Sequence, residues 1–197
     1  MAVCSRFKDF GGTVGWQQVA ILSRMNSLLA WSEEWEKDDA VDPPRGFAFA
    51  WFRSGTNDVA VYGVHLKSSL TRGAGEEAST ASVRQRELAV RQVLRHLSET
   101  QASLRERFEV VVVAGDFNTG PEQSSSETTL ATLEQAGFTS GFEGQPAAER
   151  VTWPGRGRYP DATLDCVFVQ GVKAMAPLIV ASPVSDHYLV ARTLALP

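Results

Sequence analysis

A run of apolar residues near the middle of the chain is followed at once by polar ones. The segment Glu109–Pro121 reads EVVVVAGDFNTGP, with four consecutive valines before Gly115 and then Asp116 and Asn118. A short β-branched run without polar alternation predicts a strand buried on both faces. Because side chains two residues apart in an extended segment point the same way, Asp116 and Asn118 are expected to address one ligand. Taken alone, they are more typical of a strand that ends in a turn than of a functional site.

The same pattern of apolar and polar positions predicts further strands on both sides of this segment. They are expected at residues 17–23, 47–53, 59–66, 151–153, 164–169, 177–181 and 187–196. Residues 54–57 are typical of a hairpin connection. Residues 25–39 fit a helical stripe and a loose edge strand equally well. Residues 70–79, rich in Gly, Ser, Ala and Glu, are expected to form a mobile surface loop.

Two helices are predicted between the strands. Residues 80–99 carry apolar side chains at helical spacing, and the opposite face, which includes Arg86 and His96, is expected to be solvated. Residues 126–136 are expected to form the second helix, with Gly137 placed as its C-cap. Because the helices occur singly between runs of strands, this order predicts a layered α/β or α+β sandwich with mixed sheets.

Composition limits the classes to which the chain can belong. Its 197 residues, 43% hydrophobic and 21% charged, suit one domain over residues 1–197 with a sizeable core. The net charge of −4 gives no overall basic footprint for nucleic acid, which leaves only a local basic groove. The chain has no apolar run of 18 residues and therefore no expected transmembrane helix. Cys4 and Cys166 form neither a disulfide framework nor a zinc motif.

Polar residues interrupt the apolar runs at four strand ends. They are His65, the pair Asp116 and Asn118, Asp165, and the pair Asp186 and His187. Each has a structural interpretation by itself, such as an edge histidine or a turn carboxylate. Together, these residue types suit phosphoester hydrolysis, which needs a hard cation, an aligned water molecule and charge stabilisation at the phosphoryl oxygens.

Several of these groups have a predicted chemical task. Asp116 and Asp186 supply carboxylate oxygens, which favours Mg²⁺ or Mn²⁺ over zinc as the cofactor. Asp165 is suited to orient His187 and to favour its protonated form. Asn118 can hold a phosphate oxygen or a water molecule without adding negative charge.

The ordered motifs GVHLKS, GDFNTGP, LDCVFV and SDHYLV resemble those of the endonuclease/exonuclease/phosphatase superfamily, metal-dependent phosphohydrolases similar to pancreatic-type deoxyribonuclease. The resemblance runs from about Trp16 to the C-terminus. It implies an α+β fold, a four-layered α/β/β/α sandwich with two mixed, mostly antiparallel sheets. It also implies a phosphoester substrate, with nucleic acid among the candidates, and we expect a monomer.

The resemblance assigns roles to the residues of the first two motifs. Asp116 would activate or align the attacking water and also contribute to the metal site. Asn118 would contact the scissile phosphate and help to place Asp116. His65 would contact the phosphate from the other side, and Lys67 would add positive charge nearby.

In the last two motifs, Asp186 would bind the metal, and His187, held by Asp165, would stabilise the transition state or transfer a proton. The family also begins with a strand–helix–strand unit that brings an Asn and a metal-binding Glu, and neither residue type precedes Val19 here. We therefore expect the chain to lack this unit. Metal affinity would then be reduced, and one sheet would have an open edge.

Three functions stay open from the sequence. They are a metal-dependent phosphodiesterase or nuclease, an inactive homologue or binding module, and a phosphatase for a lipid or sugar phosphate. Loops at 68–79, 122–127 and 143–161 are expected to set the substrate. Trp153 in the last one is suited to stacking on a base, and an ordinary solvated loop explains that segment at least as well. The chain would be cytoplasmic if Met1 is its true start and secreted if a signal peptide precedes it.

Overall fold

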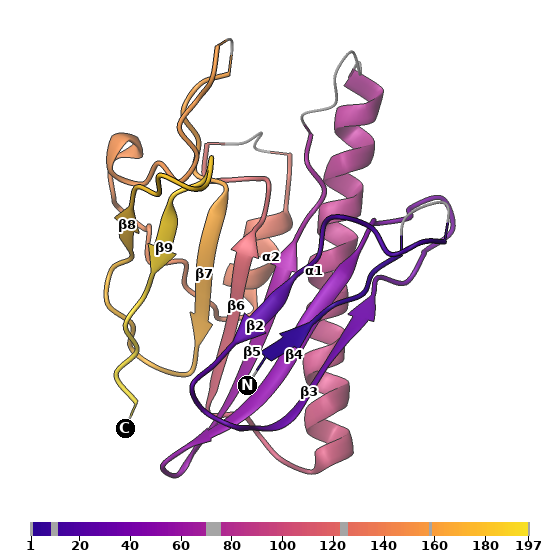
Figure 1. The fold of residues 1–197 in the computed structure, drawn as a ribbon, viewed down its shortest axis with the longest axis vertical. Helices are drawn as coiled ribbons and strands as arrows, with labels where there is room; N and C mark the ends of the chain where they lie inside the picture. The colour runs from indigo at the N-terminus through magenta and orange to yellow at the C-terminus, as the bar shows by residue number, and fades with distance from the viewer. Residues whose placement is uncertain (1, 9–11, 70–75, 123–125, 158, 197) are drawn as a thin grey trace.

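The computed structural model describes residues 2–8, 12–69, 76–122, 126–157 and 159–196 (Figure 1). In chain order the elements are β1 (Ala2–Cys4), β2 (Ala20–Leu22), β3 (Ser27–Glu34), β4 (Gly46–Ser54), β5 (Asn57–His65), α1 (Glu76–Leu104), β6 (Val110–Asp116), α2 (Thr129–Gln135), the 3₁₀ turn Ala147–Glu149, β7 (Asp165–Gln170), β8 (Leu178–Val180) and β9 (Leu189–Ala191). Neither α-helix of this described part is both long and apolar enough to cross a lipid bilayer.

A five-stranded mixed sheet forms the centre of the fold, with the strand order β3-β4-β5-β6-β7. Neighbouring strands run antiparallel except β5 and β6, which are parallel. Parallel neighbours need a crossover connection, and the 29-residue helix α1 lies in the one between β5 and β6. Because β5 and β6 run in the same direction, their C-terminal residues meet at one edge of the sheet.

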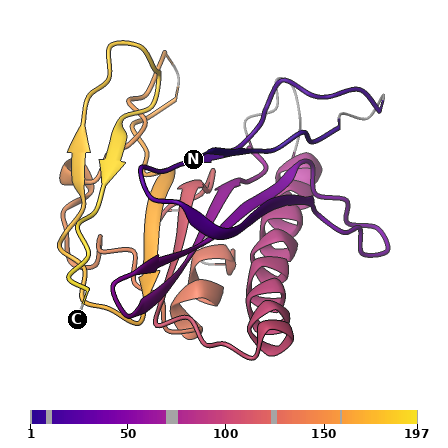
Figure 2. The same cartoon turned by 60° about the horizontal axis from the view of Figure 1, so that its bottom comes forward.

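The face of the sheet that α1 and α2 cover holds the main hydrophobic core (Figure 2). Side chains alternate between the two faces along a strand. Phe49, Tyr62, Val113 and Phe168 therefore point from four adjacent strands toward the helices, and each is almost fully buried. On α1, Val90 belongs to the same core. This packing holds the central sheet against the helices and fixes which residues point to its other face.

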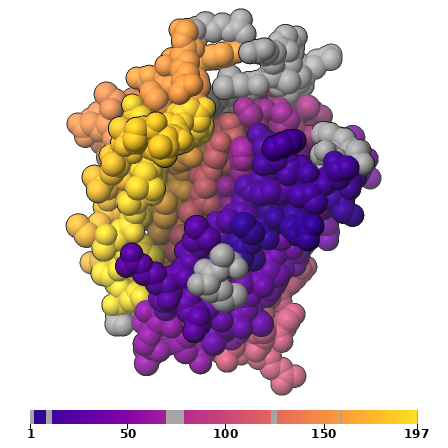
Figure 3. Space-filling model, in the orientation of Figure 1, coloured from indigo at the N-terminus to yellow at the C-terminus, as the bar shows by residue number. Residues whose placement is uncertain are grey.

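The opposite face of the central sheet carries two separate two-stranded sheets, β1-β2 and β8-β9. Leu22 of β2 and Leu189 of β9 are 78% and 59% exposed. Between these sheets, Val61, Ala114 and Val167 of the central sheet are only partly buried. Figure 3 shows central-sheet atoms at the surface between the yellow and the indigo segments. An apolar strip of the central sheet therefore borders on solvent.

The structure confirms the predicted α+β class and most of the strands. The predicted strands at 47–53 and 59–66 correspond to β4 and β5, and residues 25–39 contain the edge strand β3 and no helix. Segment 151–153 forms only an isolated bridge between Trp153 and Ala162. The predicted strand at 187–196 is limited to the three residues of β9.

Both predicted helices are present, with different lengths. α1 extends beyond the predicted 80–99 and includes residues 76–79 of the predicted loop, whereas residues 70–75 of that loop lie outside the described residues. α2 is shorter than predicted. Gly137 follows it with a φ of 89° and donates its N–H to the carbonyl oxygen of Glu134 at 2.9 Å. The predicted glycine C-cap is therefore confirmed.

The prediction that the basic face of α1 is solvated is wrong for Arg86 and His96. His96 lies in the sheet–helix interface, where its Nδ1 is 2.9 Å from the hydroxyl of Tyr62. Arg86 is only 1% exposed and donates two hydrogen bonds to Glu127, at 2.8 and 2.7 Å. It also donates to the carbonyl oxygen of Lys67 at 2.8 Å. Arg86 thus joins α1 to the segments that follow β5 and precede α2.

We expect Glu127→Gln to lower the free energy of unfolding by about 3 kcal/mol, because it leaves the buried Arg86 guanidinium without its counter-charge. Chemical denaturation measures this change. The matched control is Glu36→Gln, which breaks the exposed ion pair with Arg95 and should change stability by less than about 1 kcal/mol. Equal effects of the two substitutions would contradict the assigned importance of the buried pair.

Candidate active site

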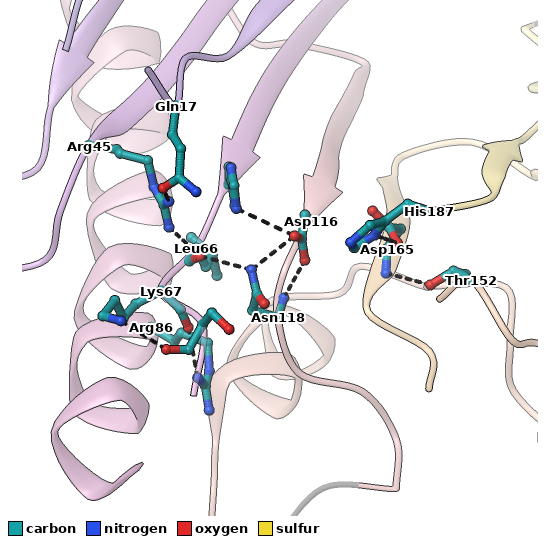
Figure 4. Close-up of polar contacts among 12 residues, drawn as sticks. Gln17, Arg45, Leu66, Lys67, Arg86, Asp116, Asn118, Thr152, Asp165 and His187 are labelled. Carbon is teal, nitrogen blue, oxygen red and sulfur yellow. Dashed lines mark hydrogen bonds and ion pairs between the residues drawn. The ribbon is translucent and has the colours of Figure 1, made fainter. Parts of the chain in front are cut away.

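Three of the predicted residues lie side by side on adjacent strands of the central sheet. His65 of β5 pairs with Asp116 of β6, and Asp116 pairs with Asp165 of β7. Side chains of directly paired residues project from the same face of a sheet. All three therefore project from the face opposite the helices, where β5 and β6 end and β7 begins. Figure 4 shows Asp116 and Asp165 there with His187 beside them. His65 Nε2 lies 3.4 Å from Asp116 Oδ2.

The GDFN sequence at 115–118 folds back onto the carboxylate of Asp116. Gly115 is required here, since a Cβ at this position would lie 1.9 Å from the carbonyl oxygen of Val64. Asn118 has a φ of 53°, and its backbone N–H and its Nδ2 donate to the two oxygens of Asp116 at 2.8 and 2.9 Å. Asp116 and Asn118 thus meet as predicted. They meet through a turn, however, and the predicted extended geometry is wrong.

His65, Asp116 and Asp165 form a row across the three strands, and the C-terminal segment brings His187 to the Asp165 end of this row. Its Nδ1 lies 2.7 Å from Oδ2 of Asp165, which is the pair expected from the sequence. Buried Thr152 fixes the start of β7, because its Oγ1 accepts the backbone N–H of Asp165 at 2.9 Å. One donor atom each of Asp116, Asp165 and His187 lies within 4.8 Å of the others. These three residues form the group of acidic and imidazole donors that is close enough to share a cation.

The two carboxylates of the row are buried close together. Burial, together with the neighbouring charge of Asp165, raises the pKa of Asp116 to about 6. Burial also raises the pKa of Asp165, against the opposing effect of its hydrogen bond with His187. Like charges in a poorly hydrated site disfavour ionisation. A bound cation would relieve this repulsion, so the donor set fits a hard metal ion.

The two histidines of the site have pKa values shifted in opposite directions. Burial lowers the pKa of His65 to about 4, and the charges of Arg45 and His187 contribute to the same shift. For His187, burial acts toward a lower pKa, but the hydrogen bond to Asp165 and the carboxylate charges outweigh it and raise the pKa. At neutral pH, His65 is therefore a neutral imidazole, and His187 is the imidazole that holds a proton more tightly.

Arg45 is a residue of the site that the sequence interpretation missed. Its Nη2 donates to the carbonyl oxygen of Leu66 at 2.5 Å, and its Nη1 donates to the side-chain oxygen of Gln17. Within the described part of the chain, its buried Nε has no hydrogen-bond partner. Burial lowers the pKa of Arg45, and the charge of Asp116 opposes this shift. In the sequence Arg45 is an isolated cation at a strand start, and no periodicity distinguishes it from a surface residue.

Arg45 and the row of His65, Asp116 and Asp165 with His187 line one cleft of about 760 Å³. Its lining includes Lys67, Asn118, Trp153 and the exposed Asp186. The structure therefore brings every predicted site residue to one cleft. Asp186, predicted as a metal ligand, lies outside the group of donor atoms formed by Asp116, Asp165 and His187.

No protein-family model and no curated protein sequence matches the chain. Solved structures do match. An endonuclease/exonuclease/phosphatase family protein from Leptotrichia buccalis is 12% identical, with a TM-score of 0.66 over 100% of this chain and 72% of that chain. A humanized D. rerio TDP2 is 18% identical, with a TM-score of 0.61 over 90% and 71% of the two chains.

A third solved structure, sphingomyelinase C from Streptomyces griseocarneus, is 20% identical, with a TM-score of 0.53 over 88% of this chain and 66% of that chain. At such identities the likeness concerns the fold. The chain has the fold of the endonuclease/exonuclease/phosphatase superfamily, which confirms the fold that the sequence motifs implied.

Asp165→Asn is expected to lower the pKa of His187, because the substitution removes the carboxylate that stabilises the imidazolium. NMR titration of the imidazole C–H signals in metal-free buffer measures the change, and the chain has only three histidines. His96, which belongs to α1 and packs on the opposite face of the sheet against Tyr62, serves as an internal reference whose pKa should not move. An unchanged pKa of His187 would contradict the assigned coupling.

Proposed function

We propose that the chain is a metal-dependent phosphoester hydrolase of the phosphodiesterase or nuclease type. The observation that supports it is the row His65, Asp116 and Asp165 on adjacent strands, with His187 hydrogen-bonded to its end and Arg45 lining the same cleft. Oxygen donors, a proton-holding imidazole and a guanidinium thereby converge on a space of about 760 Å³. Phosphoryl transfer to water requires these groups.

In this proposal, Asp116 and Asp186 hold Mg²⁺ or Mn²⁺, and Asp165 remains paired with His187. A bound divalent cation supplies charge that neutralises the phosphate oxygens. The donor set supports an oxygen-loving ion, because burial raises the pKa of both Asp116 and Asp165, and neither carboxylate has a lysine or arginine ion pair among the described contacts. The carboxylate of Asp186, which also lines the cleft, supplies further oxygen ligands for the ion.

The remaining residues bind the phosphate and move protons. Asp116 aligns the attacking water, and Asn118, hydrogen-bonded to both Asp116 oxygens, fixes the orientation of that carboxylate. His187 stabilises the charge that develops on the phosphoryl group, since its raised pKa keeps a proton available. Neutral His65 donates a hydrogen bond from the opposite side. Lys67, at the cleft wall, adds positive charge.

We expect the chain to hydrolyse bis-p-nitrophenyl phosphate, plasmid DNA or RNA with added Mg²⁺ or Mn²⁺, and to lose this activity in EDTA. Asp116→Ala and His187→Ala should each lower kcat by about 100-fold or more, because each removes a group that acts in proton transfer or charge stabilisation. Asp38→Ala, an exposed carboxylate outside the cleft, is the matched control and should leave the rate unchanged.

The same assay distinguishes the phosphodiesterase or nuclease from the two alternatives, a phosphatase and an inactive homologue. Activity that survives both active-site substitutions would contradict the assigned residues. Faster hydrolysis of p-nitrophenyl phosphate than of its diester would favour a phosphatase. Absence of turnover on every substrate, with a folded protein, would favour the inactive homologue.

Arg45→Gln should lower kcat/KM by about 100-fold, because it removes a cationic hydrogen-bond donor from the phosphate cleft. It should also raise the pKa of His65, since the charge of Arg45 contributes to the lowering of that pKa. Steady-state kinetics and NMR titration measure the two effects. Arg53→Gln, which removes a half-exposed arginine paired with Asp58 at the far end of β4, is the control. A variant with wild-type kinetics and an unshifted His65 would contradict the role of Arg45.

A further inference from the structure

A second cavity of about 470 Å³ adjoins the catalytic cleft. Its walls are mainly apolar and include Phe7, Trp16, Trp35 and Pro43. Trp35, only 7% exposed, forms the floor and packs against Phe47 with ring centroids 5.3 Å apart. Trp16 is fully exposed, at 102%. The volume lies within the range of sites that bind small organic ligands.

The two cavities share one wall. Gln17, Pro44 and Arg45 line both of them. The Arg45 guanidinium is held at this boundary by the carbonyl oxygen of Leu66 on one side and by Gln17 on the other. A ligand with a phosphate beside Arg45 can therefore place an attached group in the aromatic cavity without leaving the protein surface.

The loop that carries Trp16 is tied down by one side chain. Gln18 accepts hydrogen bonds from Ser5 Oγ and from the N–H of Phe7, at 2.7 and 2.8 Å. Its Nε2 donates to the carbonyl oxygens of Phe7 and Gly15, at 3.0 and 2.7 Å. These four bonds satisfy the amide of Gln18 and fix the backbone next to Trp16. An exposed aromatic ring on a fixed backbone binds a partner at lower entropic cost than one on a free loop.

We propose that this aromatic cavity binds a planar aromatic ring esterified to the phosphate, either a nucleobase on its sugar or an aryl group. The proposal rests on the proposed function, because it takes the phosphate to lie beside Arg45. Two tryptophans and two prolines offer flat apolar surfaces that suit a ring. Lys8 and Glu34, which also line the cavity, provide polar groups for ring substituents. Trp16 is the residue expected to determine this specificity, by stacking on the ring.

Equilibrium binding of phosphonates, whose P–C bond is not hydrolysed, tests the proposal by calorimetry with Mg²⁺ present. The probes are methylphosphonate, hexylphosphonate, 2-phenylethylphosphonate and the phosphonate analogue of thymidine 5′-monophosphate. The two ring-bearing ligands should bind about tenfold more tightly than methylphosphonate, in line with the usual strength of stacking on an aromatic side chain. The aryl and nucleoside probes distinguish the two sources of the ring.

Trp16→Ala should remove this advantage and leave methylphosphonate binding unchanged, and Trp16→Phe should retain most of it. Leu22→Ala truncates another exposed apolar residue, which lies outside the cavity, and should have no effect. Hexylphosphonate binding as tightly as the phenyl compound would overturn the assignment of an aromatic ligand. Loss of affinity for all four probes in Trp16→Ala, or equal affinity of all four for the wild type, would contradict the proposal that this cavity binds the group attached to the phosphate.

The result of this binding experiment can be distinguished from the result of the hydrolysis assay that tests the proposed function. A ring preference that depends on Trp16 in a chain without hydrolytic activity would support the cavity and contradict the hydrolase. Hydrolysis of methyl p-nitrophenyl phosphate and of bis-p-nitrophenyl phosphate with the same kcat/KM, together with equal phosphonate affinities, would support the hydrolase and contradict the cavity.

Discussion

Two buried carboxylates on adjacent strands are the constraint on which the site depends. The ladder between β6 and β7 pairs Asp116 with Asp165, so the distance between the two charges is set by backbone hydrogen bonds. Neither backbone position can move away from the other without breaking the ladder. Burial raises the pKa of both groups, the charge of Asp165 contributes to the shift of Asp116, and folding must offset that unfavourable energy. The surrounding residues are arranged to do so.

Each carboxylate has a partner of a different kind. Asn118, held in a left-handed turn, donates two hydrogen bonds to Asp116 and brings no charge. His187 shares a hydrogen bond with Asp165 and, because its pKa is raised, brings a proton. This asymmetry leaves Asp116 as the carboxylate whose direct hydrogen-bond donor, Asn118, is uncharged. A cation and a water molecule are best placed beside it, which is why the proposed chemistry centres on Asp116 and not on Asp165.

The sequence was sufficient to predict the parts that depend on local pattern and strand ends. The buried strand before Asp116, the hairpin β4–β5 and the glycine end of α2 each follow from short-range rules. Long-range partners were not predictable in this way. Arg86 stands four and seven residues before the core residues Val90 and Val93, so helical spacing places it on the apolar face of α1 and not with the solvated arginines. The partner that makes its burial possible, Glu127, lies 41 residues away. Arg45 likewise enters the site only because the segment before β4 lies next to the residues after β5.

The face of the sheet that carries the site also carries the uncovered apolar strip. Val61, Ala114 and Val167 lie on the same face as His65, Asp116 and Asp165, since alternate residues of a strand share a face. Water that reaches this strip also reaches the hydration shell of the carboxylates. Any polypeptide covering the strip would therefore desolvate Asp116 further and raise its pKa. Such a change would act first on Asp116, because burial is the largest cause of its shifted pKa.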